Sequence, residues 1–212
     1  FETLKIKVGL NPAEDIQRLK AIREAVGDSI NILSDANQGW DAKSALQIID
    51  SLAVHNLGIA MVEQPVKAWD YANLKYVRDN SRIPIYADES AFNLRDVSKI
   101  IQAQMADGIN IKLMKSGGLY AARPIYDLAT SHNLPCMAGC MLESPIGLAA
   151  MAAFVVGKSN IKFVDLDPIA MIKSNPVVGG VRLDGATLHL STGAGLGIEN
   201  IHGLIPVVTI GA

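Results

Sequence analysis

The chain has 212 residues and a formal net charge of −2, with 50% hydrophobic and 19% charged residues. These values are typical of a folded globular protein and provide no basic surface that would favour nucleic acid. No uncharged stretch is long enough to cross a membrane. Only two cysteines, Cys136 and Cys140, are present, so we predict a cytoplasmic protein with core thiols and no disulfide framework.

Seven short apolar, β-branched segments recur along the chain, and their starts are 24 to 29 residues apart. They are residues 4–8, 30–36, 59–65, 83–89, 108–113, 135–139 and 162–167. Between them lie segments with helical spacing, such as Ala45, Ile48, Ile49 and Leu52. This alternation predicts parallel strands joined by helical crossovers.

We interpret the pattern as an α/β fold, a TIM-type (β/α) barrel. A complete barrel has eight strands and about 250 residues, so we expect this chain to lack the first strand. A doubly wound open sheet is the alternative, although no glycine-rich turn follows the first predicted strand. We assign residues 1–176 to the barrel. We assign residues 177–212 to a C-terminal hairpin, at 181–190, and a tail that pack outside it.

Carboxylates follow three successive predicted strands, at the barrel end where active sites of this fold lie. They are Asp35, Glu63 and Asp88, at intervals of 28 and 25 residues. Hard oxygen ligands arranged in this way suit Mg²⁺. The sequence therefore predicts a magnesium site at the C-terminal ends of these strands.

Two lysines, Lys7 and Lys112, belong to the second and sixth strands of an eight-strand count, on opposite walls of the barrel. One lysine could remove a proton from a substrate carbon while the other returns a proton on the opposite face. A metal ion bound beside that carbon would stabilise the charge that develops. The arrangement favours racemisation or epimerisation.

The motifs KIK, DAN, EQP, DES and INIK occur in an order and spacing that resemble the muconate-lactonising-enzyme subgroup of the enolase superfamily. The resemblance implies a modified (β/α)7β barrel and an N-terminal capping domain, which we expect this chain to lack. It implies that Lys7 and Lys112 are the acid/base pair and that the three carboxylates bind Mg²⁺. It also implies that Lys5 contacts the substrate carboxylate and that Asn37 and Glu89 support the metal site.

The segment VDLDP resembles the Asp-x-Asp motif with which dipeptide epimerases hold the α-ammonium group of a dipeptide, here Asp165 and Asp167. Side chains two apart on a strand share a face. KLMKSGG and CMLES also resemble the L-Ala-D/L-Glu epimerase branch, although we interpret Lys115 in the first of them as structural or exposed. The resemblance thus implies a Mg²⁺-dependent dipeptide epimerase, which we expect to be a homo-oligomer.

Other functions remain open. An N-acylamino-acid racemase, an o-succinylbenzoate synthase or a cycloisomerase would share the same core residues. Paired carboxylates favour a cationic substrate group over an acyl group or a second anion. A non-catalytic barrel that binds a metal is an alternative of a different class, and it would not need Lys7 or Lys112.

Overall fold

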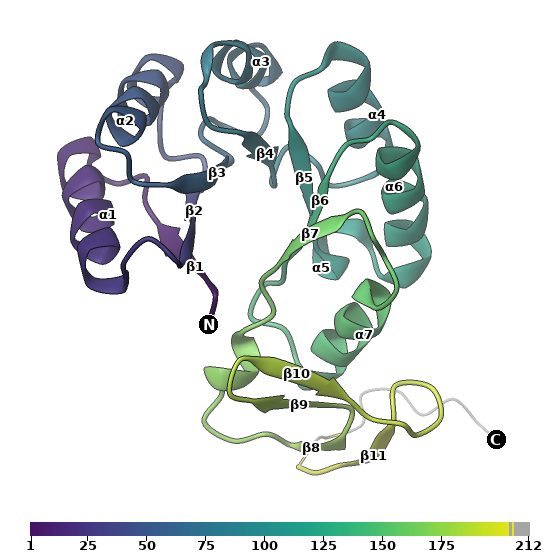
Figure 1. Cartoon of the computed structure of the whole chain (residues 1–212). Helices are drawn as coiled ribbons and strands as arrows, with labels where there is room; N and C mark the ends of the chain where they lie inside the picture. The colour runs from purple at the N-terminus through teal and green to yellow at the C-terminus, as the bar shows by residue number, and fades with distance from the viewer. Residues whose placement is uncertain (204, 206–212) are drawn as a thin grey trace.

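The computed structural model describes residues 1–203 and 205. Seven parallel strands form one curled sheet in sequential order, with helices on its outer side (Figure 1). The strands are β1 (Thr3–Lys7), β2 (Asn31–Asp35), β3 (Ile59–Glu63), β4 (Ile85–Ala87), β5 (Gly108–Ile111), β6 (Cys136–Ala138) and β7 (Ile161–Val164). In a doubly wound sheet the strand order reverses at a switch point. The sequential order excludes that alternative and confirms the wall of a barrel.

Helices follow the strands along the chain and lie on the outer side of the sheet (Figure 1). They are α1 (Pro12–Val26), α2 (Ala42–Val54), α3 (Tyr71–Asn80), α4 (Leu94–Ala103), α5 (Leu113–Ser116), α6 (Leu119–Ser131), α7 (Pro145–Val155) and the 3₁₀ turn η1 (Pro168–Ala170). The Asn11 side chain accepts hydrogen bonds from two backbone amides of α1 and so caps that helix. In α2 the four predicted apolar residues are all buried.

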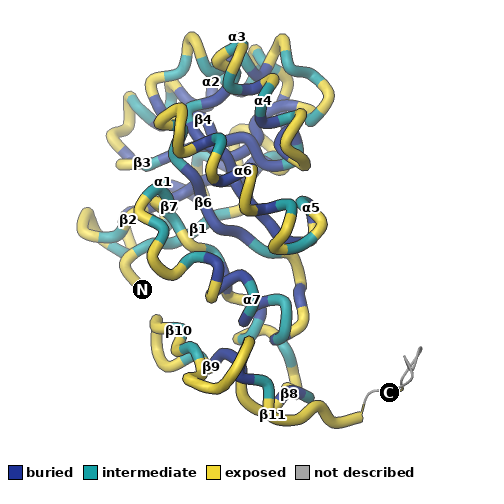
Figure 2. The backbone as a smooth tube through the Cα atoms, turned by 90° about the vertical axis from the view of Figure 1, so that its right-hand side faces the viewer, coloured by how far each residue is buried: buried dark blue, intermediate teal, exposed yellow. Residues whose placement is uncertain are grey.

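The two faces of the sheet have separate apolar clusters, because side chains alternate along each strand. Outward-facing residues such as Ile32 and Val62 pack against the helices. Inside the curl lies a smaller cluster of Leu33, Met61, Tyr86 and Met137. Figure 2 shows that buried positions concentrate in the strands and in the facing sides of the helices. The inner cluster forms an apolar floor beneath the C-terminal ends of the strands.

The last described segment contains two small antiparallel sheets. Strands β9 (Val181–Asp184) and β10 (Thr187–Leu190) form the predicted hairpin, with Gly185 and Ala186 in its turn. Strand β8 (Val177–Gly179) pairs with β11 (Ile198–Ile201). Both sheets lie beyond α7, away from the curled sheet (Figures 1 and 2).

The predicted boundary after residue 176 stays a prediction, and residues 204 and 206–212 of the predicted tail lie outside the described residues. Within the described part of the chain, no helix is both long and apolar enough to cross a membrane.

Candidate active site

The three predicted metal-binding carboxylates lie directly above the apolar floor. Asp35 and Glu63 end β2 and β3, each two residues after a member of the inner cluster, so strand alternation places them on the same inward face. Asp88 comes two residues after Tyr86 of that cluster, but it follows β4, which ends at Ala87. Asp35 and Glu63 are register partners on adjacent strands. The three residues are between 0% and 1% exposed. Burial of this much negative charge requires cationic partners close by.

Lys5 supplies one of these cations. Its Nζ lies 2.8 Å from Glu63 Oε2, 3.0 Å from Asp35 Oδ2 and 3.1 Å from Asp165 Oδ2. Burial acts to lower the pKa of Lys5, but the carboxylates of Glu63, Asp35 and Asp165 outweigh burial and raise it above its ordinary value. Lys5 is therefore a fixed ammonium that joins β1 to the residues after β7.

Lys7 lies on the same face of β1 as Lys5 and contacts the outer part of the site. Its Nζ donates hydrogen bonds to Asp35 Oδ2 at 2.5 Å and to Asn37 Oδ1 at 2.8 Å. Asn37 Nδ2 in turn donates to Glu89 Oε1 at 3.3 Å. The Lys7 side chain is 61% exposed, so its amine is accessible to a small molecule.

Lys112 and Lys115 pair with Asp88, at the end of the carboxylate row away from Lys7. Lys112 Nζ donates to Asp88 Oδ2 at 2.6 Å, and Lys115 Nζ donates to Asp88 Oδ1. Burial alone would raise the pKa of Asp88, but the two ammonium groups lower it below its ordinary value. Burial likewise acts to lower the pKa of Lys112, and Asp88 raises it overall.

Strand β5 ends at Ile111, so Lys112 is not a strand residue as predicted. It precedes the short helix α5 as its N-cap residue. The longer predicted strand was wrong because the backbone turns into α5 directly after Ile111.

The last predicted strand, residues 162–167, also ends early, and this changes the argument for Asp165 and Asp167. Strand β7 ends at Val164, so both aspartates belong to the following loop and strand alternation does not apply to them. Asp165 contacts Lys5, whereas Asp167 is exposed. Partial burial and then the charge of Asp165 raise the pKa of Asp167, which indicates that the two carboxylates lie within electrostatic reach of each other.

Two amides that the sequence reasoning missed organise the carboxylates. Asn110 Nδ2 donates to Glu63 Oε1 at 2.6 Å. Gln64 Oε1 accepts hydrogen bonds from the backbone amides of Asp88 at 2.9 Å and Ser90 at 3.0 Å. The signal for Asn110 was an amide in the middle of an otherwise apolar buried strand, since such a group needs a polar partner.

Gly139 leaves the space that the Asn110 amide occupies. A Cβ atom at position 139 would lie 2.5 Å from Asn110 Oδ1. We expect Gly139→Ala to displace the amide from Glu63 and to lower the free energy of unfolding by about 1–3 kcal/mol, measured by urea denaturation. The matched control is Gly193→Ala, whose Cβ would have no neighbour closer than 3.2 Å. Equal destabilisation by the two substitutions would contradict this role of Gly139.

The two cysteines are free thiols with no sign of a redox or metal role. Cys136 is buried, and the thiol of Cys140 donates to the backbone carbonyl of Asp165 at 3.0 Å. Burial raises the pKa of each thiol to about 12, assisted for Cys140 by nearby carboxylates. Both thiols therefore stay protonated near neutral pH.

The donor set fits a divalent metal in its chemistry. Burial, followed by the charges of Asp35 and Asp88, raises the pKa of Glu63 to about 7 although Lys5 opposes the shift. Glu63 Oε2 is held by the ammonium group of Lys5, whose Nζ lies 2.8 Å away. Three buried carboxylates at the ends of neighbouring strands are hard oxygen donors of the kind that Mg²⁺ prefers.

In the present arrangement, no three acidic, histidine or cysteine side chains among the described residues lie close enough together to hold a metal ion. The carboxylate oxygens that would bind the metal are instead paired with lysines. Lys5 contacts Asp35 and Glu63, and Lys112 contacts Asp88. A metal shared by the three carboxylates would require these lysines to withdraw from them.

Comparison with known proteins identifies the family of this chain. Residues 1–201 match the family described as enolase C-terminal domain-like. The chain belongs to this family. The chain spans about half the length of the curated relatives that it matches, for example 56% of the L-Ala-D/L-Glu epimerase of Clostridium acetobutylicum. That relative is 43% identical over 202 residues, which are 95% of this chain.

Solved structures of family members have the same fold. The substrate-liganded L-Ala-D/L-Glu epimerase from Bacillus subtilis superposes with a TM-score of 0.92 and 42% identity, over 95% of this chain and 56% of that one. The dipeptide epimerase from Enterococcus faecalis, complexed with Mg and the dipeptide L-Leu-L-Tyr, gives a TM-score of 0.89 and 44% identity, over 94% of this chain and 56% of that one.

Proposed function

We propose that this chain is the barrel domain of a Mg²⁺-dependent dipeptide epimerase. The observation that carries the proposal is a row of three buried carboxylates with one lysine at each end. Lys7 contacts the carboxylate of Asp35, and Lys112 contacts that of Asp88. Lys7 belongs to β1 and Lys112 follows β5, and these strands are not neighbours in the sheet, so the two amines approach the row of carboxylates from different sides.

The chain's own residues would perform the proton transfers. With a dipeptide bound between them, one lysine removes the α-proton next to the free carboxylate as a neutral amine. The other lysine donates a proton to the opposite face of the planar enediolate. Asp165 and Asp167 provide negative charge for the dipeptide's α-ammonium group. Lys5 provides a fixed positive charge on the same side.

Asp35, Glu63 and Asp88 would hold the metal ion. When bound, Mg²⁺ supplies positive charge that stabilises the developing charge on the substrate carboxylate. Asn110 and Gln64 fix Glu63 and the backbone of Asp88, so that these ligands stay oriented. Homo-oligomerisation and a cytoplasmic location are further parts of the proposal.

A racemase of N-acylated amino acids is the closest alternative reaction. It would use the same lysines and metal ligands, but its substrate has no α-ammonium group. Asp165 and Asp167 therefore distinguish the two activities. A non-catalytic metal-binding barrel is distinguished by the lysines, which it would not require.

Deuterium uptake tests the proposal. The complete protein, with Mg²⁺, is incubated in D₂O with L-Ala-L-Glu or with N-acetyl-L-Ala-L-Glu, and the α-proton signals are followed by NMR. We expect exchange and epimerisation of the free dipeptide. We expect rates about 100-fold lower for the acetylated compound, because it has no ammonium group to interact with the negative charge of the two aspartates.

The control is Asp165→Asn/Asp167→Asn, which should remove this preference for the free amine. Equal rates on both compounds with the unaltered protein would favour the racemase. No exchange with any of a panel of dipeptides and N-acyl amino acids would contradict an enzymatic role.

A further inference from the structure

Lys115 is the most completely buried cation near the carboxylates, with a side chain that is 0% exposed. Its Nζ donates to Asp88 Oδ1, to the Asp88 carbonyl at 2.6 Å and to the Asn110 carbonyl at 2.9 Å. The ring centroid of Phe92 lies 5.8 Å from the same nitrogen. These contacts use the donors of the ammonium group entirely within the protein. The sequence reasoning, which treated Lys115 as structural or exposed, did not foresee this position.

Lys115 contacts only one of the two carboxylate oxygens of Asp88. Oδ1 faces Lys115, which no solvent reaches, whereas Oδ2 faces Lys112. Lys115 also holds the backbone of Asp88 through its carbonyl. Side chain and backbone are thus fixed together, and Oδ2 is the oxygen left to face the site.

The same ammonium reaches a second carboxylate indirectly. Lys115 binds the carbonyl of Asn110, and the side-chain amide of Asn110 donates to Glu63 Oε1 at 2.6 Å. Lys115 Nζ therefore links three segments. It binds the backbone after β4 and strand β5 directly, and it reaches the end of β3 through the amide of Asn110. A displacement of Lys115 would move two of the three carboxylates.

We propose that Lys115 is a positioning residue for the metal site, which sets the orientation of Asp88 directly and that of Glu63 through Asn110. The inference rests on the proposed function, because it assumes that these carboxylates bind Mg²⁺. A buried ammonium is costly, and an apolar side chain of similar volume often gives equal or greater stability. Stability therefore does not by itself account for a lysine here, whereas orientation of a ligand does.

Calorimetric titration with Mg²⁺ tests this role in the complete protein. Lys115→Met keeps most of the side-chain volume and removes the ammonium group. Loss of a residue that orients metal ligands typically lowers affinity by 10–100-fold, and we expect a loss of about this size. An electrostatic effect alone would act the other way, since removing a cation beside the site should strengthen Mg²⁺ binding.

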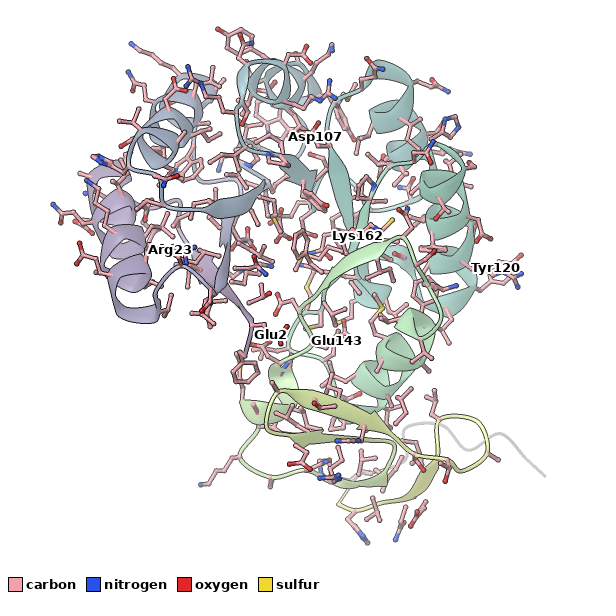
Figure 3. The ribbon with its side chains drawn as sticks, viewed as in Figure 1. Glu2, Arg23, Asp107, Tyr120, Glu143 and Lys162 are labelled. Carbon is pink, nitrogen blue, oxygen red and sulfur yellow. The ribbon has the colours of Figure 1, made fainter. Side chains whose placement is uncertain are left out.

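Arg23 offers a matched control, because it is another buried cation that holds backbone carbonyls. Its guanidinium donates to the carbonyls of Leu57 at 2.8 Å, Gly27 at 2.6 Å and Ile30 at 2.7 Å. These carbonyls precede β2 and β3, at the end of the sheet opposite to the carboxylates. Figure 3 shows Arg23 between α1 and the strands. Arg23→Met should lower the melting temperature and leave Mg²⁺ affinity within about twofold.

The outcomes separate the two hypotheses. Weaker binding by Lys115→Met alone supports the positioning role. Unchanged or tighter binding by Lys115→Met, or an equal loss in both variants, overturns it while the proposed function stands. Absence of Mg²⁺ binding by the unaltered protein overturns the proposed function and this inference with it. Should Lys115→Met fail to fold, Lys115→Gln, which keeps hydrogen-bond donors, is titrated in its place with the same criteria.

Discussion

We expect Lys112→Ala to abolish the proposed epimerisation in both directions, with a loss of about 10³-fold or more, but still to exchange the α-proton of one epimer with solvent deuterium. Inversion needs a base on one face of the substrate carbon and an acid on the other, and in the proposed mechanism each lysine serves one face. In that variant Lys7 would remove and return the proton on its own side without changing the configuration. General acid–base catalysis contributes typically 10²–10⁴-fold, which sets the size of the expected loss. NMR of each epimer in D₂O measures both reactions.

The reciprocal variant is the control for this prediction. Lys7→Ala should exchange the other epimer, and it too should fail to epimerise. If one lysine served both faces, removal of the idle lysine would leave epimerisation near the rate of the unaltered protein. Exchange of the same epimer by both variants would also contradict a two-base mechanism. A non-catalytic barrel would exchange neither epimer even before substitution.

We expect Asp88→Asn to lower the affinity for Mg²⁺ by about 100-fold or more in calorimetric titration. The substitution removes a full negative charge from a buried group that is 1% exposed. It also leaves Lys112 and Lys115 without their carboxylate partner, so two ammonium groups then oppose a bound cation. Oxygen ligands of Mg²⁺ in proteins are chiefly carboxylates, and a neutral amide is a weaker donor.

Asp107→Asn is a suitable control for Asp88→Asn. Asp107 is also paired with a cation, since it accepts a hydrogen bond from Arg78 Nε at 2.8 Å. It lies just before β5, at the opposite end of the sheet (Figure 3). Asp107→Asn should change stability and leave Mg²⁺ affinity within about twofold. Unchanged binding by Asp88→Asn would rule out Asp88 as a ligand.

The barrel wall could be predicted because each strand and helix has a strong local pattern. The carboxylate row followed from it, since residues at the ends of neighbouring parallel strands lie side by side. Strand ends were less accurate: Lys112 and Asp165 follow their strands, because β5 and β7 stop where the backbone turns. Local alternation contains no information about such turns.

The contacts among the site residues could not be predicted, because they depend on side chains that meet only in the folded sheet. Lys115 belongs to a four-residue helix, where periodicity does not distinguish a buried position from an exposed one. The amide of Asn110 was visible as a polar residue in an apolar strand, but its partner, Glu63, lies two strands away. Only the three-dimensional arrangement identifies these residues as supports of the carboxylates.

The ion pair between Lys5 and Asp165 has a consequence for folding. The two residues are 160 positions apart (165 − 5), yet their charged groups are 3.1 Å from each other. Contacts between distant parts of a chain form late and slow the folding reaction, because the intervening segments must first be ordered. Lys5 also contacts Asp35 and Glu63, so the fully connected arrangement exists only after β7 has reached its place. Catalytic competence should therefore emerge as the final event of refolding, after the helices and most of the sheet have already formed.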